Sequence, residues 1–471
     1  MTGLLAILLL AAAGVAHAQR APASPPPVAP PRRTTHQATV DVRFDNGLRL
    51  TMMPVRGAPV AHVVLAIRAG RLTEPLTRRG IAAVTAAYLR EGSTAYSRES
   101  LADAIADLAP LGGDLSVSAG DAETLISGTV LPEEAPALVR LLASLVAEPA
   151  FPASALERLT DSEADRVSSE NVQPATRASS LADSLLGFDE RVWSPPRALA
   201  LRALTRDDVV AFWRRAYRPS AAQLYVSGVY DAAAIREVAE RAFSSWRDTA
   251  TGLVPVASEA PDAPARAGTG LVIHLVDRPG ATQARVVVGY RTVDPSHPDF
   301  TPLQVLHNVL GSVQSSRIVA SVRERHGYSY NVSSGLLARP SSSRWTVSAD
   351  IANAAVSPAL REILAEIERM SRDGVGGDEL ASFQTLLVGD LTIENATPEG
   401  RVRTLRRIAL FRGDPAYLDT FAERIFAVTP SQLQSVARKY LAPSRAVIVV
   451  VGDRKQIEPS LAALGVVAPI R

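Results

Sequence analysis

The sequence predicts an α+β fold made of two homologous domains, each a largely antiparallel sheet packed with helices. Three observations lead to it. The chain has 471 residues, more than one hydrophobic core usually organises. Runs typical of strands are followed by runs typical of helices and then by a closing strand. The end of the first half is repeated in order and spacing at the end of the second half, which indicates duplication.

The composition is that of a packed globular protein, with 47% hydrophobic and 21% charged residues. Its 50 basic and 48 acidic residues are dispersed and leave a net charge of +2. This balance gives no reason to expect nucleic acid or an acidic membrane surface as a partner. The chain has no cysteine, which excludes disulfides, thiolate metal ligands and a cysteine nucleophile.

The first 18 residues have the pattern of a signal peptide. A short apolar core from Leu4 to Ala13 precedes Ala16-His17-Ala18, a small-x-small pattern that suits cleavage after Ala18. The alternative is a membrane anchor, but the core is shorter than the roughly 20 residues that span a bilayer. We therefore expect a periplasmic or secreted mature chain with no membrane span.

Two proline-rich stretches set the expected domain boundaries. The first gives a tether over residues 19–38, and the second, with Pro255, Pro261 and Pro264, gives a linker over residues 251–268. Between and after them lie an N-terminal domain, residues 39–250, and a C-terminal domain, residues 269–471.

In the first domain, Asn46-Gly47 predicts a hairpin turn between two strands. A β-rich run follows, and then helical patterns, two more strands and a helix opened by Pro132, a favoured first helical residue. The expected strands span 40–44, 48–53, 61–68, 114–119 and 123–130, and the expected helices span 80–90, 97–108 and, as long helical stretches, 152–186.

The repeat that indicates duplication runs from Thr205 to Gly228 and again from Thr429 to Gly452, with equal separation. Each copy predicts a capped helix, a proline-marked turn and a buried strand that ends at glycine.

Several short motifs together resemble the pitrilysin and mitochondrial processing peptidase family over nearly the whole mature chain. In the first half these are Asn46-Gly47-Leu48, Arg68-Ala69-Gly70, Gly80-Ile81-Ala82 and Glu91-Gly92-Ser93-Thr94. In the second half they are Leu310-Gly311, Ser315-Ser316-Arg317 and the run from Arg323 to Tyr330. The resemblance implies a chain whose two domains form half of a clamshell.

Members of this family carry an inverted zinc motif, H-x-x-E-H, just after the glycine matched by Gly80. Here the three positions are Ala83, Ala86 and Ala87, which have no donor atom. The third zinc ligand, a glutamate, is expected near Ala164 to Arg166. Glu163 and Glu170 lie nearby, and we interpret both as part of a solvated helix face.

No other catalytic group replaces the missing motif in the sequence. No pair of histidines in the mature chain has the i, i+4 spacing of a helical ligand pair, and no serine elbow, phosphate loop or dinucleotide fingerprint is present. His307 is interpreted as a packed or surface residue, and His326 as a turn residue.

The second half keeps what the family uses to bind substrate. The resemblance assigns Arg323 and Tyr330, seven residues apart, to the substrate backbone. Their chemistry suits this role, because a tyrosine hydroxyl can stabilise a developing oxyanion and a guanidinium can hold a carbonyl. The alternative is an exposed helix arginine with a core tyrosine.

The resemblance therefore implies an inactive partner subunit of a heteromeric zinc peptidase. It would bind peptide through Arg323 and Tyr330, hold no cofactor itself, and pair with a homologous subunit that carries the zinc. The main alternative is a scaffold or peptide-binding module with no role in proteolysis. A third reading is an active peptidase with unusual ligands.

Overall fold

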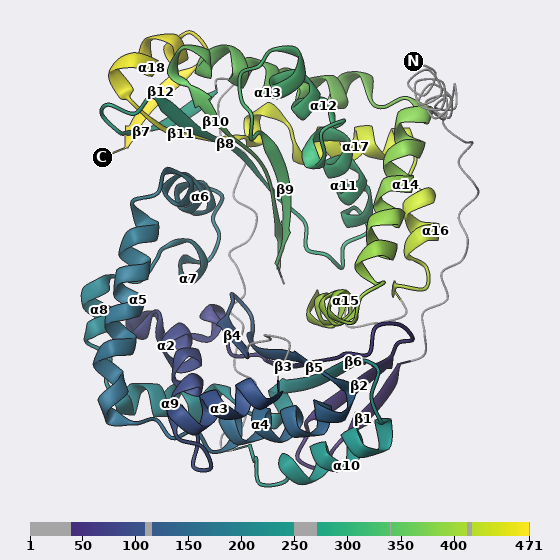
Figure 1. Cartoon of the computed structure of the whole chain (residues 1–471). Helices are drawn as coiled ribbons and strands as arrows, with labels where there is room; N and C mark the ends of the chain where they lie inside the picture. The colour runs from purple at the N-terminus through teal and green to yellow at the C-terminus, as the bar shows by residue number, and fades with distance from the viewer. Residues whose placement is uncertain (1–38, 109–114, 249–270, 340, 412–416, 471) are drawn as a thin grey trace, which may run out of the picture. The chain divides into compact units, whose positions relative to one another are not determined.

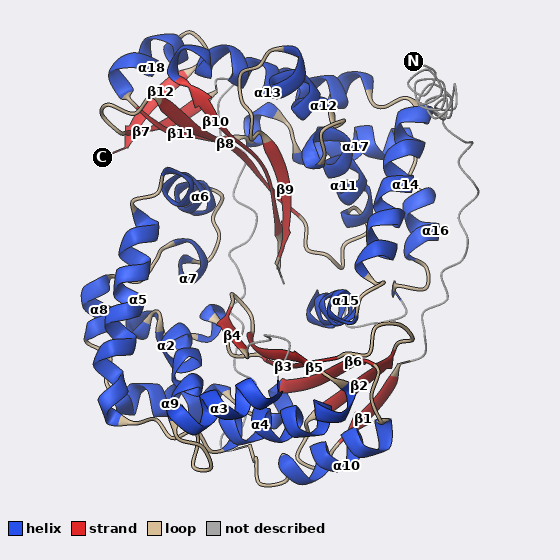
Figure 2. Ribbon diagram, viewed as in Figure 1, coloured by secondary structure: helices blue, strands red, loops and turns tan. Residues whose placement is uncertain are grey.

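The computed structural model describes residues 39–108, 115–248, 271–339, 341–411 and 417–470. The predicted signal peptide, tether and linker lie outside these ranges. Figure 2 shows two sheets, each with its helices, and the α+β class is confirmed. Within the described ranges, no helix combines the length and hydropathy needed to cross a membrane.

The N-terminal sheet has six strands in the order β1-β2-β6-β3-β5-β4. The predicted hairpin joins β1 to β2, and Gly47 takes the left-handed conformation (φ +93°) that this turn needs. The β2 and β6 strands pair in parallel, and every other pair is antiparallel. The strands are β1 (Val40–Arg43), β2 (Arg49–Pro54), β3 (Ala61–Ile67), β4 (Ser116–Ala119), β5 (Thr124–Val130) and β6 (Ala222–Gly228).

The C-terminal sheet has the order β12-β7-β11-β8-β10-β9. Its last five strands repeat the order of five strands in the first sheet, from β2 to β4. The sixth strand differs, because β12 comes from the end of the chain and pairs in parallel with β7. The strands are β7 (Val272–Asp277), β8 (Gln283–Thr292), β9 (Ser333–Ala338), β10 (Ser343–Ala352), β11 (Val447–Gly452) and β12 (Val466–Ile470).

The helices of the first half follow the predicted pattern. Thr205 caps α9 through a reciprocal capping box with Asp208. The helices are α2 (Ile81–Tyr88), α3 (Arg98–Leu108), α4 (Ala135–Ala147), α5 (Leu156–Asn171), α6 (Pro174–Leu185), α7 (Glu190–Trp193), α8 (Ala198–Arg202), α9 (Arg206–Ala216) and α10 (Ala232–Ala242).

The second half repeats this arrangement, and Thr429 caps α17 in the same way, with Gln432 as its partner. A π-helical turn, Ala320–Arg325, follows α12. The helices are α11 (Phe300–His307), α12 (Arg317–Val319), α13 (Val356–Asp373), α14 (Gly377–Glu394), α15 (Pro398–Phe411), α16 (Phe421–Phe426), α17 (Pro430–Tyr440) and α18 (Arg454–Ala462).

Central strands are buried on both faces, which explains their continuous apolar sequences. In β3, Val63 and Leu65 join the main core of the first half, whereas Val64 and Ala66 face the opposite way. In β11, Ile448 joins the core of the second half and Val449 faces away from it. Successive side chains of a strand point to opposite faces, so each sheet needs a second covering layer.

That second layer is exchanged between the halves (Figure 1). The α6 helix of the first half packs on β8 and β11 of the second, where Ala178 and Ala182 contact the outward valines. The α15 helix of the second half packs on β3 and β6 of the first through Val402. Because α6 and α15 each follow a long helix in their own half, they are corresponding helices of the duplication.

Charged pairs fix each exchanged helix at its border. Asp183 of α6 lies among the apolar contacts and pairs with Arg344 and, at 3.2 Å, with Arg339. Arg406 of α15 pairs at 2.6 Å with Glu123, just before β5. Burial raises the pKa of Glu123, and Arg406 opposes that shift.

Candidate functional site

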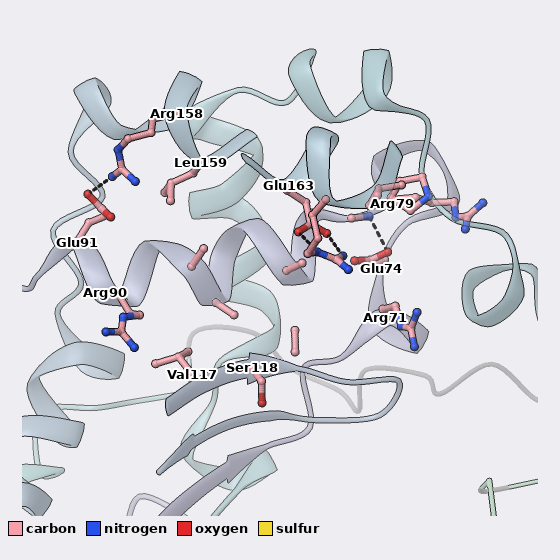
Figure 3. Close-up of a pocket in the computed structure, with 18 of the residues that line it drawn as sticks. Arg71, Glu74, Arg79, Arg90, Glu91, Val117, Ser118, Arg158, Leu159 and Glu163 are labelled. Carbon is pink, nitrogen blue, oxygen red and sulfur yellow. Dashed lines mark hydrogen bonds and ion pairs between the residues drawn. The ribbon is translucent and has the colours of Figure 1, made fainter. Parts of the chain in front are cut away.

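A cavity of about 930 Å³ lies beside α2 in the first half. Its walls come from α2, α3, α5, the edge strand β4 and residues 194–196, and Figure 3 shows its lining side chains. This volume is near the upper end of the range for ligand pockets.

The start of α2 is held by an unusual buried cap. Gly80 adopts the left-handed conformation (φ +86°), and the Glu74 carboxylate accepts hydrogen bonds from the backbone nitrogens of Gly80 and Ala82, each 2.9 Å long. Burial raises the pKa of Glu74, whereas these two hydrogen bonds lower it. The helix on which the resemblance places the zinc motif is therefore held at its start by a buried side chain.

The structure places Ala83, Ala86 and Ala87 along the cavity wall. Positions i, i+3 and i+4 of a helix share one face, so the three methyl groups lie together. A methyl group can neither coordinate a metal nor take a proton from water. The cavity is therefore large enough for a ligand, but the side chains of this wall have no atom that coordinates a metal or accepts a proton.

The α5 wall carries the two glutamates considered as a third ligand, Glu163 and Glu170, and both line the cavity. Glu163 does not lie on a solvated face, since its side chain is only 13% exposed. Arg166 lies between them and pairs with Glu163 at 2.5 Å and with Glu170 at 2.7 Å. Hydrogen bonding to Glu163, foremost, raises the pKa of Arg166.

These residues do not suit zinc. A catalytic zinc needs three protein ligands, and the nearby carboxylates are already neutralised by a guanidinium that is fixed in the chain. Across the described part of the chain, no cluster of three or more histidine, aspartate or glutamate side chains has a metal-binding arrangement.

Arg323 and Tyr330 are brought together in the second half. The Arg323 guanidinium lies over the Tyr330 ring, 4.4 Å from its centroid, in a cation–π contact. Arg323 comes from the π-helical turn and also pairs with Glu324 at 3.2 Å. The tyrosine is 81% exposed, which differs from the alternative of a core residue.

The pair does not share a cavity with the alanines. All described residues that line the large cavity fall between residues 71 and 196, in the first half. The structure thus brings the predicted residues together in two groups, one in each half.

A second cavity, of about 270 Å³, occupies the corresponding place in the second half. Its wall from α14 has the same spacing as the wall from α5, and its other wall repeats the i, i+3, i+4 pattern of the alanines. The α14 wall comprises Leu387, Asp390, Leu391 and Glu394, and the other wall comprises Gln304 and His307 of α11 with Asn308 directly after it.

In that cavity His307 is held as a neutral ring. Its Nδ1 atom forms a 2.8 Å hydrogen bond with the Ser334 hydroxyl, and burial lowers the pKa of His307 to about 4. This agrees with the expected packed residue. His326 stacks on Tyr328 with ring centroids 5.1 Å apart.

The sequence reasoning missed two features of the site. The first is the position of Arg166 between two carboxylates, although a glutamate three residues before and another four residues after an arginine is a readable helical signal. The second is the arginine-rich lining, whose members come from separate elements and have no shared sequence signal.

Sequence comparisons identify a family for both halves. Residues 54–186 match the profile described as "Insulinase (Peptidase family M16)", and residues 203–387 match "Peptidase M16 inactive domain". A protein described as an uncharacterized zinc protease from Mycobacterium bovis is 26% identical over 455 residues, covering 95% of this chain and 99% of that protein. A similarly described protein from Bacillus subtilis is 23% identical over 58% of this chain and 61% of its own length.

Solved structures share the fold. A protease from Helicobacter pylori matches with a TM-score of 0.81 and 17% identity, covering 89% of this chain and all of that one. A peptidase M16 inactive domain from Pseudomonas fluorescens matches with a TM-score of 0.77 and 19% identity over 88% and 98% of the two chains. The periplasmic protease PqqL from Escherichia coli matches with a TM-score of 0.72 and 15% identity, over 95% of this chain and 50% of that one.

Proposed function

This chain belongs to peptidase family M16, as the resemblance predicted, and we propose that it is a non-catalytic subunit that contributes substrate binding to a heteromeric zinc peptidase. One contrast carries the proposal. The positions of the zinc motif are alanines on a cavity wall, whereas Arg323 and Tyr330 are in contact, with Tyr330 open to solvent and Arg323 25% exposed. The chain keeps one half of the site chemistry and lacks the other.

The Arg323 and Tyr330 pair supports a role toward a peptide. In the described part of the chain the Tyr330 hydroxyl forms no hydrogen bond, and the residue is 81% exposed, so its hydroxyl can donate to a carbonyl oxygen of a peptide. The stacked Arg323 fixes the ring and presents N–H groups to a second carbonyl. The zinc-bound water would come from a homologous subunit with an intact motif.

The proposal also includes a location for the protein. The predicted signal peptide supports export, and one structural relative is described as a periplasmic protease. We therefore place the pair in the periplasm or outside the cell.

A second candidate function is a scaffold or peptide-binding module with no role in proteolysis. The contacts of Arg323 with Glu324 and with the Tyr330 ring favour it, because they occupy the guanidinium within the chain, as a purely structural role requires.

The test reconstitutes this chain with a zinc-bearing homologue and measures peptide turnover. Tyr330→Phe keeps the ring over Arg323 and removes only the hydroxyl, so it should lower kcat by about 10²-fold, as for the loss of one oxyanion donor. Arg323→Ala should mainly raise KM if its contact is equal in the ground and transition states.

Matched controls come from the same segment. Tyr328→Phe and Arg325→Ala remove the same groups from neighbouring residues and should leave turnover unchanged. Every variant is first checked for co-elution with the homologue. Unchanged kinetics in both Tyr330→Phe and Arg323→Ala would favour the scaffold.

A further inference from the structure

Among the charged side chains that line the large cavity beside α2, arginines outnumber acids, although Arg71, Arg79 and Arg191 also pair with acids outside the lining. The lining includes seven arginines but only four glutamates. One of those glutamates, Glu74, is buried and committed to the cap of α2. The arginines are Arg71, Arg79, Arg90, Arg98, Arg158, Arg166 and Arg191.

At one end of α2, two arginines share a single acid. Glu91 is buried, with its side chain 7% exposed, and lies 2.5 Å from Arg158 and 3.7 Å from Arg98. The side chains of Arg158 and Arg98 are about half exposed, at 47% and 57%. Because one carboxylate cannot satisfy ten N–H donors, both retain donors for a further acid.

The other end of α2 also has two arginines, of which Arg79 is 12% exposed and pairs with Glu190 at 3.1 Å. Figure 3 shows Arg71 and Arg79 beside Glu74, with Arg90 and Arg158 at the far end of the helix. Arg71 pairs with Asp121 and remains 46% exposed. Between the two ends, the alanine wall offers only methyl groups, which suit the backbone and small side chains of a peptide.

We propose that this cavity binds an acidic peptide segment, with one carboxylate at each end of α2. The inference rests on the proposed peptide-binding function and names its substrate class. Guanidiniums hold carboxylates through paired hydrogen bonds. The eight residues of α2 rise about 12 Å, and in an extended peptide residues i and i+4 point to one side about 13 Å apart. Two acids separated by three residues therefore fit this wall.

Calorimetric titration of the full chain tests the proposal with two uncharged-ended peptides. Acetyl-Glu-Ala-Ala-Ala-Glu-amide should bind at least tenfold more tightly than its glutamine counterpart, and its affinity should fall with rising salt. Equal binding of the two peptides would overturn the proposal. So would inorganic phosphate that displaces the acidic peptide at equal concentration, because the cavity would then be a general anion site.

Variants locate the binding. Arg98→Gln and Arg158→Gln each leave Glu91 with one arginine partner, so the fold should persist. Each variant should bind the acidic peptide at least fivefold more weakly than the wild type does. Arg241→Gln removes an exposed arginine, paired with Glu237 on α10, that does not line the cavity, and it should change nothing. Circular dichroism verifies folding. Unchanged affinity in both cavity variants would also overturn the proposal.

The two proposals fail separately. Tyr330→Phe and Arg323→Ala lie in the other half and should leave this affinity unchanged. Acidic peptide binding without any effect of those variants on turnover would retain this inference and refute the catalytic-support role. Loss of turnover in those variants, together with equal binding of the acidic peptide and its glutamine counterpart, would refute only the inference of an acidic peptide.

Discussion

Arg166 places a fixed positive charge between the two carboxylates nearest the alanine wall. In Arg166→Ala, Glu163 would remain largely buried without a partner, which costs about 1–3 kcal/mol in the free energy of unfolding. Urea unfolding measures the loss. The control Arg241→Ala breaks an exposed pair on α10 and should stay within about 0.5 kcal/mol of wild type. Equal losses in both variants would show that the central arginine is an ordinary surface residue.

The same arginine governs any attempt to restore metal. We expect the purified chain to hold no stoichiometric zinc in elemental analysis, because the alanine methyls cannot coordinate it. Combining Ala83→His, Ala86→Glu and Ala87→His should give weak zinc binding, and adding Arg166→Ala should strengthen it by freeing Glu163. Tight zinc in the unmodified chain would contradict this account.

His307 gives the protein a pH-dependent stability. Its pKa falls from 6.5 to about 4 on folding, so the unfolded chain gains a proton before the folded chain does. The stabilisation from burying the neutral ring is fully present above pH 6.5. It is lost as the pH falls toward 4, and the free energy of unfolding is about 2 kcal/mol lower at pH 5 for this reason. His307→Gln should remove this part of the difference between urea midpoints at pH 7 and pH 5. The more exposed His297→Gln should keep the wild-type difference.

At the level of elements, the buried acid Asp183 ties α6 to the second half through two arginines. Asp183→Asn leaves Arg344 without a charged partner, and leaves Arg339, whose side chain is 5% exposed, with only the more distant Asp121 at 3.7 Å. Breaking a buried pair in this way costs about 3–5 kcal/mol. Thermal unfolding measures it, and Asp165→Asn, on an exposed carboxylate of α5, is the control. A loss below about 1 kcal/mol would place the α6 contact outside the stabilising core.

Local signals in the sequence predicted elements of the first half and the closing helix and strand of each half. The Asn46-Gly47 turn, the Thr205 and Thr429 caps and the β-branched strands each depend on neighbouring residues, so their positions agree with the structure. The pairing of β12 with β7 was not predictable, because Val466–Ile470 is short, contains Pro469 and pairs with a strand nearly 200 residues earlier. The exchange of α6 and α15 was missed for the same reason: helical periodicity reveals an apolar face but not its partner.

The candidate site also has a part that the sequence predicted and a part that it did not. The alanine positions and the Arg323–Tyr330 spacing follow from motifs along the chain, and the structure places the first on a cavity wall and the second in contact. The arginine lining depends on α2, α3 and α5 meeting in space, which no local pattern encodes.

For the whole molecule, the exchanged helices make the two halves interdependent. Residues 39–250 and 269–471 expressed separately should each be poorly soluble, because each exposes a sheet face, with Val64 and Tyr225 in one and Val287 and Val449 in the other. Co-expressed, a tagged first half should retain the second on an affinity column. A soluble, cooperatively unfolding first half alone would show that α15 is dispensable.

The exchange also orders events during synthesis. When the ribosome has released the first half, α6 has emerged about 100 residues before β8, against which it packs, and the first sheet still lacks α15. The nascent first half therefore presents apolar surface until almost the entire chain has been made, a period in which chaperones can bind it. If the chain is exported, the same delay keeps the precursor unfolded, which is the state that a narrow secretion channel accepts.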